Sequence, residues 1–340
     1  MKTMSKRISY AFIFAFLVIS FSAINTSAQN KKQISANKQA ESLSDTIKLS
    51  SDPDFYAITL KKDIPVAEKI MKDLLPYKDS KTTGELMVMA AKKLLGNEYV
   101  AGTLEEGDSE DVRVYLSKTD CIIFVETCMN LALTVKKYGK DANFEKLCQM
   151  VRQSRYRDGQ VRCYSDRIHY TTEWIRQGEK RGIVDDITLK CGGQVYDHPI
   201  NFMTSHYKSY KHLKDAEVTK ECCGNEKEME TCTMNQATKD YNVIAKVEKE
   251  LNTQPYTYIP QDKIKANEKS IKSGDIIGYM STTKGLDIAH VVIAYWRPDG
   301  KLGFIHASMG KMKVVVDEKT INDYANDSKG INGIKVIRVR

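Results

Sequence analysis

The sequence predicts an α+β fold in which helices come first along the chain and an antiparallel sheet follows. Between residues 64 and 152, apolar residues recur at the three-to-four-residue spacing of amphipathic helices. From Gly274 onward, the chain changes to short runs rich in β-branched and aromatic residues, separated by turn residues. Because helical and strand segments are segregated in this way, the α+β class is favoured.

Four helices are expected before the sheet. They span residues 64–75, 85–95, a segment that opens at residue 121 and stays apolar through residue 135, and residues 143–152. In the first helix, Val66, Ile70 and Leu74 fall on one face. Gly96 ends the second helix, and a loop over residues 97–105 leads toward the third.

Five strands are expected after Gly274. They span residues 275–280, 290–296, 302–308, 312–316 and 334–339. A turn over residues 297–300 joins the second and third of these strands into a hairpin. That hairpin is expected to place His290 and His306 side by side on neighbouring strands.

The first 28 residues are organised like a signal peptide. A basic start precedes a nearly continuous apolar run over residues 8–23, and small residues precede a predicted cleavage site after Ala28. The run is short for a membrane span, which needs about 20 residues. An uncleaved anchor is the alternative. We therefore expect an exported, periplasmic protein without stable membrane association after cleavage.

The rest of the chain predicts a flexible lead-in over residues 29–53, which are polar, and a single domain over residues 54–340. The formal net charge of +8 includes three basic residues and no acidic residue in the leader, which leaves +5. No block of lysine and arginine is interleaved with aromatic residues. Nucleic-acid binding is therefore not expected.

Cys121 is the candidate nucleophile, because it stands at the start of an apolar helix. Asp120 is a good N-cap residue, since its carboxylate accepts unpaired backbone N–H groups of the first turn. The dipole at a helix N-terminus favours an anion, and we therefore expect the thiolate of Cys121 to be favoured over the thiol. A cysteine that merely fills the core is the alternative for this residue taken alone.

His290 and His306 complete the candidate catalytic group. A nucleophile on a helix, a base on a strand and a third polar group on the next strand form the order of a papain-like cysteine hydrolase. His290 is expected to take the thiol proton. His306 is expected to bond the other ring nitrogen of His290 and fix its tautomer. The backbone N–H of Cys121 is expected to stabilise an oxyanion.

Several short motifs are spread over roughly residues 80–320. They are Tyr99 to Glu105, Asp120-Cys121 with Phe124-Val125, Arg157-Asp158-Gly159, Arg167-Ile168-His169-Tyr170, Asn201-Phe202-Met203, Gly274-Asp275-Ile276, Gly285 to His290, and His306-Ala307-Ser308. Together these motifs resemble the NlpC/P60 superfamily of papain-fold cell-wall hydrolases. In detail they resemble its DUF1460 branch, the N-acetylmuramoyl-L-alanine amidase-like family.

The resemblance implies a papain-like amidase domain that cuts the bond between N-acetylmuramic acid and L-alanine, with no cofactor or metal. It also implies that the substrates are small peptidoglycan fragments, the anhydro-muropeptides that carry a 1,6-anhydro-muramyl sugar. The chain departs from the superfamily at Ile122-Ile123, where Ser-Gly is frequent. It also departs in a cysteine-containing loop inserted near residues 214–238.

A further group of residues is a candidate for oxyanion or substrate binding. Its members are Tyr99, Asp120, Thr103, Glu105, Arg167, His169, Tyr170, His206 and Asp287. A guanidinium suits a peptide carboxylate and an aromatic face suits a sugar ring, so the cluster from Arg167 to Tyr170 is expected to bind both ligand ends. Asp287 either binds a substrate amine or hydroxyl, or caps a turn after Gly285. Ordinary structural roles are the alternative for each of these residues.

The chain has eight cysteines. Cys128 is expected in the core, about two turns beyond Cys121. In the inserted loop, Cys222 or Cys223 is expected to form a disulfide with Cys232, and a zinc site with His206 or His212 is the alternative. The pairing of Cys163 and Cys191 stays open.

Two other functions also stay open. The first is a γ-D-glutamyl–diamino-acid endopeptidase of the same superfamily, which would use the same catalytic residues. The second is a non-catalytic cell-wall binding protein.

Overall fold

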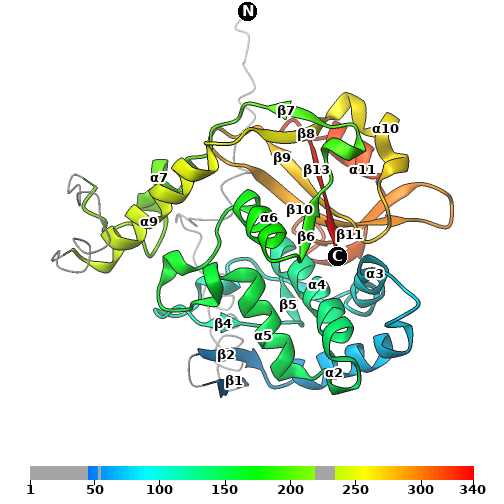
Figure 1. The fold of residues 1–340 in the computed structure, drawn as a ribbon, viewed down its shortest axis with the longest axis horizontal. Helices are drawn as coiled ribbons and strands as arrows, with labels where there is room; N and C mark the ends of the chain where they lie inside the picture. The colour runs from blue at the N-terminus through cyan, green and yellow to red at the C-terminus, as the bar shows by residue number, and fades with distance from the viewer. Residues whose placement is uncertain (1–44, 53–54, 219–233) are drawn as a thin grey trace, which may run out of the picture.

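The computed structural model describes residues 45–52, 55–218 and 234–340. Within these residues the chain forms a mixed α+β structure, with a large sheet and a group of helices beside it (Figure 1). No helix of the described part is long and apolar enough to cross a membrane. The predicted signal peptide lies outside the described residues, as do Cys222, Cys223 and Cys232 of the predicted insert.

The longer helices of the first half agree in position with the four that the sequence predicts. The helices of the described residues are α2 (Asp63–Leu74), α3 (Thr83–Lys93), α4 (Cys121–Tyr138), α5 (Phe144–Arg155), α6 (Thr171–Lys180), α7 (Phe202–Ser205), α9 (Gln236–Leu251), α10 (Ile264–Asn267) and α11 (Ile321–Asn326). Helix α4 is central, because it packs against α2, α3 and α5 on one side and against the large sheet on the other. Helices α6, α7, α9, α10 and α11 were not predicted from the sequence.

The strands form a large sheet and a small one. They are β1 (Thr46–Asp52), β2 (Phe55–Leu60), β3 (Glu98–Tyr99), β4 (Val112–Arg113), β5 (Lys118–Thr119), β6 (Val184–Asp186), β7 (Gln194–Tyr196), β8 (Tyr256–Pro260), β9 (Ile276–Ser281), β10 (Ile288–Trp296), β11 (Leu302–Ser308), β12 (Lys313–Val316) and β13 (Ile331–Val339). The large sheet has the order β5-β3-β12-β11-β10-β9-β13-β8-β7, with β6 beside β13. The small sheet has the order β1-β2-β4.

The central strands of the large sheet are buried on both faces. Ile276 and Val291 point into the core that contains α4, whereas Ile277 and Val292 point into a second core on the opposite face. Burial on both faces explains why these strands are apolar almost throughout rather than alternating with polar residues. The five predicted strands are all present, and β11 has the predicted bounds.

A buried ion pair joins α4 to α5. The guanidinium of Arg155 donates to Glu126 from Nε at 2.8 Å and from a terminal nitrogen at 2.5 Å. The remaining terminal nitrogen of Arg155 donates to the carbonyl of Arg113 on β4. Because all donors of this buried cation point at acceptors, the pair fixes the orientation of α4 relative to α5 and β4.

Three details of the predicted fold are wrong. The lead-in predicted as flexible over residues 29–53 contains β1, which pairs antiparallel with β2. The sheet is not purely antiparallel, because β3 pairs parallel with β5 at its edge. Val66, which was predicted on the same face as Ile70 and Leu74, is 42% exposed. Ala67, three residues before Ile70, lies on the buried face of α2 instead.

Candidate active site

Cys121 is the first residue of α4, as predicted. The Asp120 carboxylate caps the helix by accepting the backbone N–H of Ile123 at 2.9 Å. The side chain of Cys121 is buried, and the backbone N–H of Val291 on β10 lies close enough to the thiol to act on its pKa. This contact places the thiol beside the residue that follows His290 in the sequence.

The two predicted histidines are joined by a hydrogen bond. His290 Nε2 and His306 Nδ1 are 2.7 Å apart. His290 follows an irregularity in the pairing of β9 with β10, and such bulges turn side chains at functional sites. His306 lies on β11, opposite Val315 of β12. The prediction that these strands set the two imidazoles side by side is therefore confirmed.

A third group extends this hydrogen-bonded chain. Asp317 Oδ2 lies 3.1 Å from His306 Nε2, so His306 is held at both ring nitrogens. Asp317 directly follows β12, and its backbone N–H donates to the carbonyl of Phe304 at 3.0 Å. The sequence analysis missed Asp317. An aspartate at the end of the strand next to that of His306 was the available indication.

Aromatic rings surround the histidine pair. The ring of Tyr324 on α11 lies 6.0 Å from each imidazole, centroid to centroid. Tyr279 lies parallel to His290, and Phe304 packs edge-on against His306. The sequence analysis also missed Tyr324, which reaches the site from a helix whose role could not be read from residue spacing. These rings shield the hydrogen bonds of the pair from water.

Burial sets the protonation of the site. It raises the pKa of the Cys121 thiol to about 12, and the nearby charge of Asp120 acts in the same direction. It lowers the pKa of His290 to about 3 and that of His306 to about 4, although Asp317 opposes the shift of His306. The expectation of a thiolate is therefore wrong for the resting site, because loss of hydration outweighs the helix dipole. The resting site holds a neutral thiol and neutral imidazoles.

Tyr99 lies close to Cys121, as expected. It is the register partner of Thr119 in the parallel pair of β3 and β5, immediately before Asp120 and Cys121. Burial raises the pKa of its phenol, and the charges of Cys121 and Asp120 add to the shift. Tyr99 therefore keeps its O–H and remains a hydrogen-bond donor near the thiol.

Arg167 is not placed as a free anchor for a substrate carboxylate. Its guanidinium lies 2.5 Å from Glu105 and 3.2 Å from Glu110, and it packs over the ring of Tyr164 at 5.1 Å. The side chain is buried. Two carboxylates of the chain thus occupy the positions that the sequence analysis assigned to a ligand, although Glu105 itself remains partly exposed.

The neighbours of Arg167 in the motif are also held by the protein. His169 Nε2 hydrogen bonds to the carbonyl of Tyr164 at 2.9 Å. The hydroxyl of Tyr170 donates to Glu248 at 2.6 Å and accepts the backbone N–H of Met203 at 2.8 Å. These contacts join the segment before α6 to α7 and α9, and the aromatic face of Tyr170 is buried.

The remaining candidates have structural contacts of their own. Asp287 accepts the backbone N–H of Thr172 at 2.7 Å and that of Ile288 at 2.8 Å, so it caps the start of α6. These contacts engage both oxygens of Asp287 within the protein, but at the start of α6 and not in the predicted turn after Gly285. His206 Nδ1 hydrogen bonds to the carbonyl of Phe202 at 2.8 Å. Thr103 is buried, and its hydroxyl has no hydrogen-bond partner among the described residues.

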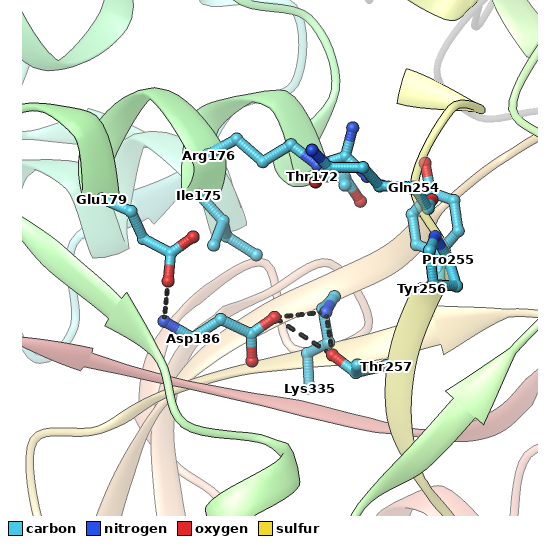
Figure 2. Close-up of a pocket in the computed structure, with 10 residues that line it drawn as sticks. All are labelled: Thr172, Ile175, Arg176, Glu179, Asp186, Gln254, Pro255, Tyr256, Thr257 and Lys335. Atoms are coloured by element: carbon cyan, nitrogen blue, oxygen red, sulfur yellow. Dashed lines mark hydrogen bonds and ion pairs between the residues drawn. The ribbon is translucent and has the colours of Figure 1, made fainter. Parts of the chain in front are cut away.

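A cavity of about 120 Å³ lies between α6 and strands β6, β8 and β13 (Figure 2). Lys335 crosses its floor and donates to Asp186 at 2.6 Å and to Thr257 at 2.9 Å. Cys121 and His290 do not line it. Lys335 and Asp186 are thus paired with each other in this cavity. Cys121 and the two histidines, and not this cavity, therefore define the candidate site.

Among the described residues, no three His, Cys, Asp or Glu side chains are grouped so that they could hold a metal ion. Cys121, Cys128, Cys148, Cys163 and Cys191 are free thiols. Cys128 is fully buried, as predicted for a core residue. His212, the other residue named for a zinc site, stacks on Tyr164 at 4.8 Å.

The sequence model of the AmiA-like family, described as N-acetylmuramoyl-L-alanine amidase-like, matches residues 89–331. The chain belongs to this family. The matched region contains Cys121, His290, His306 and Asp317. All residues of the hydrogen-bonded group therefore lie in the part of the chain that the family shares. No curated protein sequence matches the chain.

Solved structures resemble this member of the family. One is an N-acetylmuramoyl-L-alanine amidase from Bacteroides uniformis, with 30% sequence identity and a TM-score of 0.65 over 76% of this chain and 99% of that chain. Another is from Bacteroides fragilis, with a name that proposes a xylanase, 30% identity and a TM-score of 0.63 over 73% and 98% of the two chains. Protein LPG0564 from Legionella pneumophila, named with DUF1460, has 21% identity and a TM-score of 0.57 over 81% and 94%, which shows the fold alone.

Proposed function

We propose that the protein is a cysteine amidase that hydrolyses the bond between N-acetylmuramic acid and L-alanine in peptidoglycan fragments, with anhydro-muropeptides as its substrates. One observation carries the cysteine mechanism. In a member of an amidase-like family, a cysteine at a helix N-terminus lies beside a strand whose histidine is hydrogen bonded to a second histidine. A histidine can activate a cysteine thiol as a nucleophile and then protonate the leaving amine, and a second histidine can hold the first in place.

The first step forms an acyl-enzyme. His290 takes the proton from the Cys121 thiol as the sulfur attacks the lactyl carbonyl carbon of the muramic acid. Both the thiol and the imidazole are neutral before the reaction. The proton is therefore transferred from Cys121 to His290 only when the substrate carbonyl is in place. The tetrahedral intermediate carries its charge on the former carbonyl oxygen. The backbone N–H of Cys121 and the hydroxyl of Tyr99 are the donors proposed for that oxyanion.

The second step releases the peptide and restores the thiol. The protonated His290 gives its proton to the alanine nitrogen, the carbon–nitrogen bond breaks, and a thioester to Cys121 remains. A water molecule then loses a proton to His290 and adds to the thioester carbon. Breaking of the carbon–sulfur bond and return of the proton to sulfur give a free lactyl carboxyl and the original enzyme.

We extend the proposal to the superfamily and the compartment. The order of Cys121 on α4, His290 on β10 and His306 on β11 supports a papain-like arrangement of the NlpC/P60 type. The basic and apolar pattern of residues 1–28 supports export to the periplasm, where soluble muropeptides would be met. A non-reducing peptide map of protein isolated from the periplasm would also test the disulfide proposed for Cys222 or Cys223 with Cys232.

Digestion of one defined anhydro-muropeptide tests the activity. Mass spectrometry should find a free peptide beginning with L-alanine and an anhydro-muramic acid without peptide. Cys121→Ser serves as the control, because it keeps a side chain of similar size at the helix start. A product in which L-Ala-D-Glu remains on the sugar would instead assign the protein as the γ-D-glutamyl endopeptidase. Slow thiol labelling of Cys121 and no turnover would favour a non-catalytic binding protein.

A glycosidase function is not supported by this site. Glycoside hydrolysis generally uses a pair of carboxylates that flank the scissile bond. Here the proposed nucleophile is the thiol of Cys121, the carboxylate of Asp120 caps its helix, and the carboxylate of Asp317 is hydrogen bonded to His306. We therefore do not transfer the name of the Bacteroides fragilis structure to this chain.

A further inference from the structure

The carboxylate of Asp317 binds two different partners with its two oxygens. Oδ2 lies 3.1 Å from His306 Nε2, and Oδ1 accepts the backbone N–H of Lys319 at 2.9 Å. An ionised carboxylate accepts hydrogen bonds and donates none. The proton between Asp317 and His306 therefore belongs to Nε2 of His306.

The proton on Nε2 of His306 determines where the proton between His306 and His290 lies. A neutral imidazole has one N–H and one lone pair. Because His306 donates from Nε2, its Nδ1 holds the lone pair and accepts a hydrogen bond from Nε2 of His290, 2.7 Å away. The lone pair of His290 is then on Nδ1. Without a lone pair on that nitrogen, His290 has no atom left with which to accept the thiol proton.

We propose that Asp317 is a positioning residue that sets the tautomers of both histidines through its contact with His306, while the backbone N–H of Lys319 anchors its other oxygen. The proposal deepens the proposed function, on which it rests for the use of the lone pair of His290. The tautomers themselves belong to the resting protein and are measurable without substrate. This arrangement of protons requires that both imidazoles are neutral. The low pKa values of His290, about 3, and His306, about 4, agree with that requirement.

Asp317→Asn should reverse the whole chain of protons. The asparagine oxygen takes the place of Oδ1 as acceptor for Lys319, which turns the NH₂ group toward His306. His306 must then accept at Nε2, carry its proton on Nδ1 and donate to His290. His290 would carry its own proton on Nδ1 and lose its basic atom. Turning the amide the other way removes the acceptor of the partly buried backbone N–H of Lys319.

The kinetic expectation separates two variants. To recover the active tautomers, Asp317→Asn has to lose the Lys319 hydrogen bond, and we expect kcat to fall about 10- to 100-fold. Asp317→Ala imposes neither tautomer, so its kcat should fall less than that of the asparagine variant. A residue that only stabilised the fold would show the opposite order, since alanine removes both contacts.

The matched control is Asp299→Asn in the hairpin between β10 and β11. Asp299 accepts the backbone N–H of Lys301 at 3.1 Å, the same two-residue spacing as Asp317 and Lys319. Its partner beyond that turn is Arg297 instead of a histidine. This variant should leave kcat and both tautomers unchanged.

Nitrogen NMR of the full chain with ¹⁵N-labelled histidine tests the assignment directly. The wild type should show His306 and His290 both protonated at Nε2, and Asp317→Asn should show both protonated at Nδ1. Protonation of wild-type His306 at Nδ1 would overturn the proposal even if no variant folds, as would unchanged tautomers in a folded Asp317→Asn. Inverted tautomers with unchanged kcat would support this proposal and refute the proposed use of His290 as the base.

Discussion

Lowering the pH from 7 to 4 should destabilise the protein, and a defined part of the loss should come from His306. The imidazole is 2% exposed and has a pKa of about 4, whereas a histidine in an unfolded chain titrates near pH 6.5. Above about pH 6.5 neither state holds the extra proton, and between pH 6.5 and 4 mainly the unfolded state holds it. The free energy of unfolding should therefore fall as the pH falls, by about 1.4 kcal/mol per pH unit and about 3 kcal/mol in total.

Urea unfolding at several pH values, followed by tryptophan fluorescence, measures this loss. In His306→Gln the side chain cannot titrate. Between pH 6.5 and 4, the slope of the variant's free energy of unfolding against pH should therefore be smaller than the wild-type slope by roughly 1 kcal/mol per pH unit. His206→Gln, at a half-buried histidine outside the pair, controls for the change of residue type. Equal slopes for the wild type and His306→Gln would mean that His306 takes up a proton inside the fold, and the burial argument would fail.

The remaining predictions concern the catalytic group and Arg167. Cys121→Ala should abolish muropeptide hydrolysis with an unchanged circular dichroism spectrum, and turnover near the wild-type rate would exclude the cysteine mechanism. His290→Ala should reduce kcat about as much as loss of the thiol, whereas His306→Ala should reduce it less, and the reverse order would exchange their roles. Arg167→Ala should lower the free energy of unfolding by roughly 3–5 kcal/mol in urea, because it leaves the buried Glu110 without its cation. An unchanged unfolding midpoint with a raised KM would restore Arg167 as a ligand anchor.

The positions of Cys121 and of the histidine pair could be predicted because each depends on local sequence. Asp120 before an apolar run marks the start of α4, and a turn between two apolar runs marks the hairpin that carries His290 and His306. The two strands are paired in register from Ile293 with Ile305 onward, so the imidazoles meet on the diagonal. Pairing of this kind follows from strand order alone.

The properties that depended on packing could not be predicted. The protonation of Cys121 is set by the depth at which α4 meets β10, and no spacing along the chain reports that depth. Arg167 suited a ligand carboxylate as a residue type, but Glu105 and Glu110, about 60 positions earlier in the sequence, occupy its guanidinium. Asp287 was expected to bind substrate or to cap a turn after Gly285, but it accepts the backbone N–H of Thr172 at the start of α6, a helix that the sequence did not predict.

The separation of the catalytic residues along the chain affects when activity can first appear during folding. Helix α4, which begins at Cys121, contacts strands β10 and β11, which carry the two histidines and lie far from α4 in the sequence. Contacts between such distant segments generally form late, because a long loop must close before they stabilise anything. A nascent chain that ends before β10 contains Cys121 but lacks His290, the proposed base. The proposed hydrolysis therefore requires that the sheet is complete.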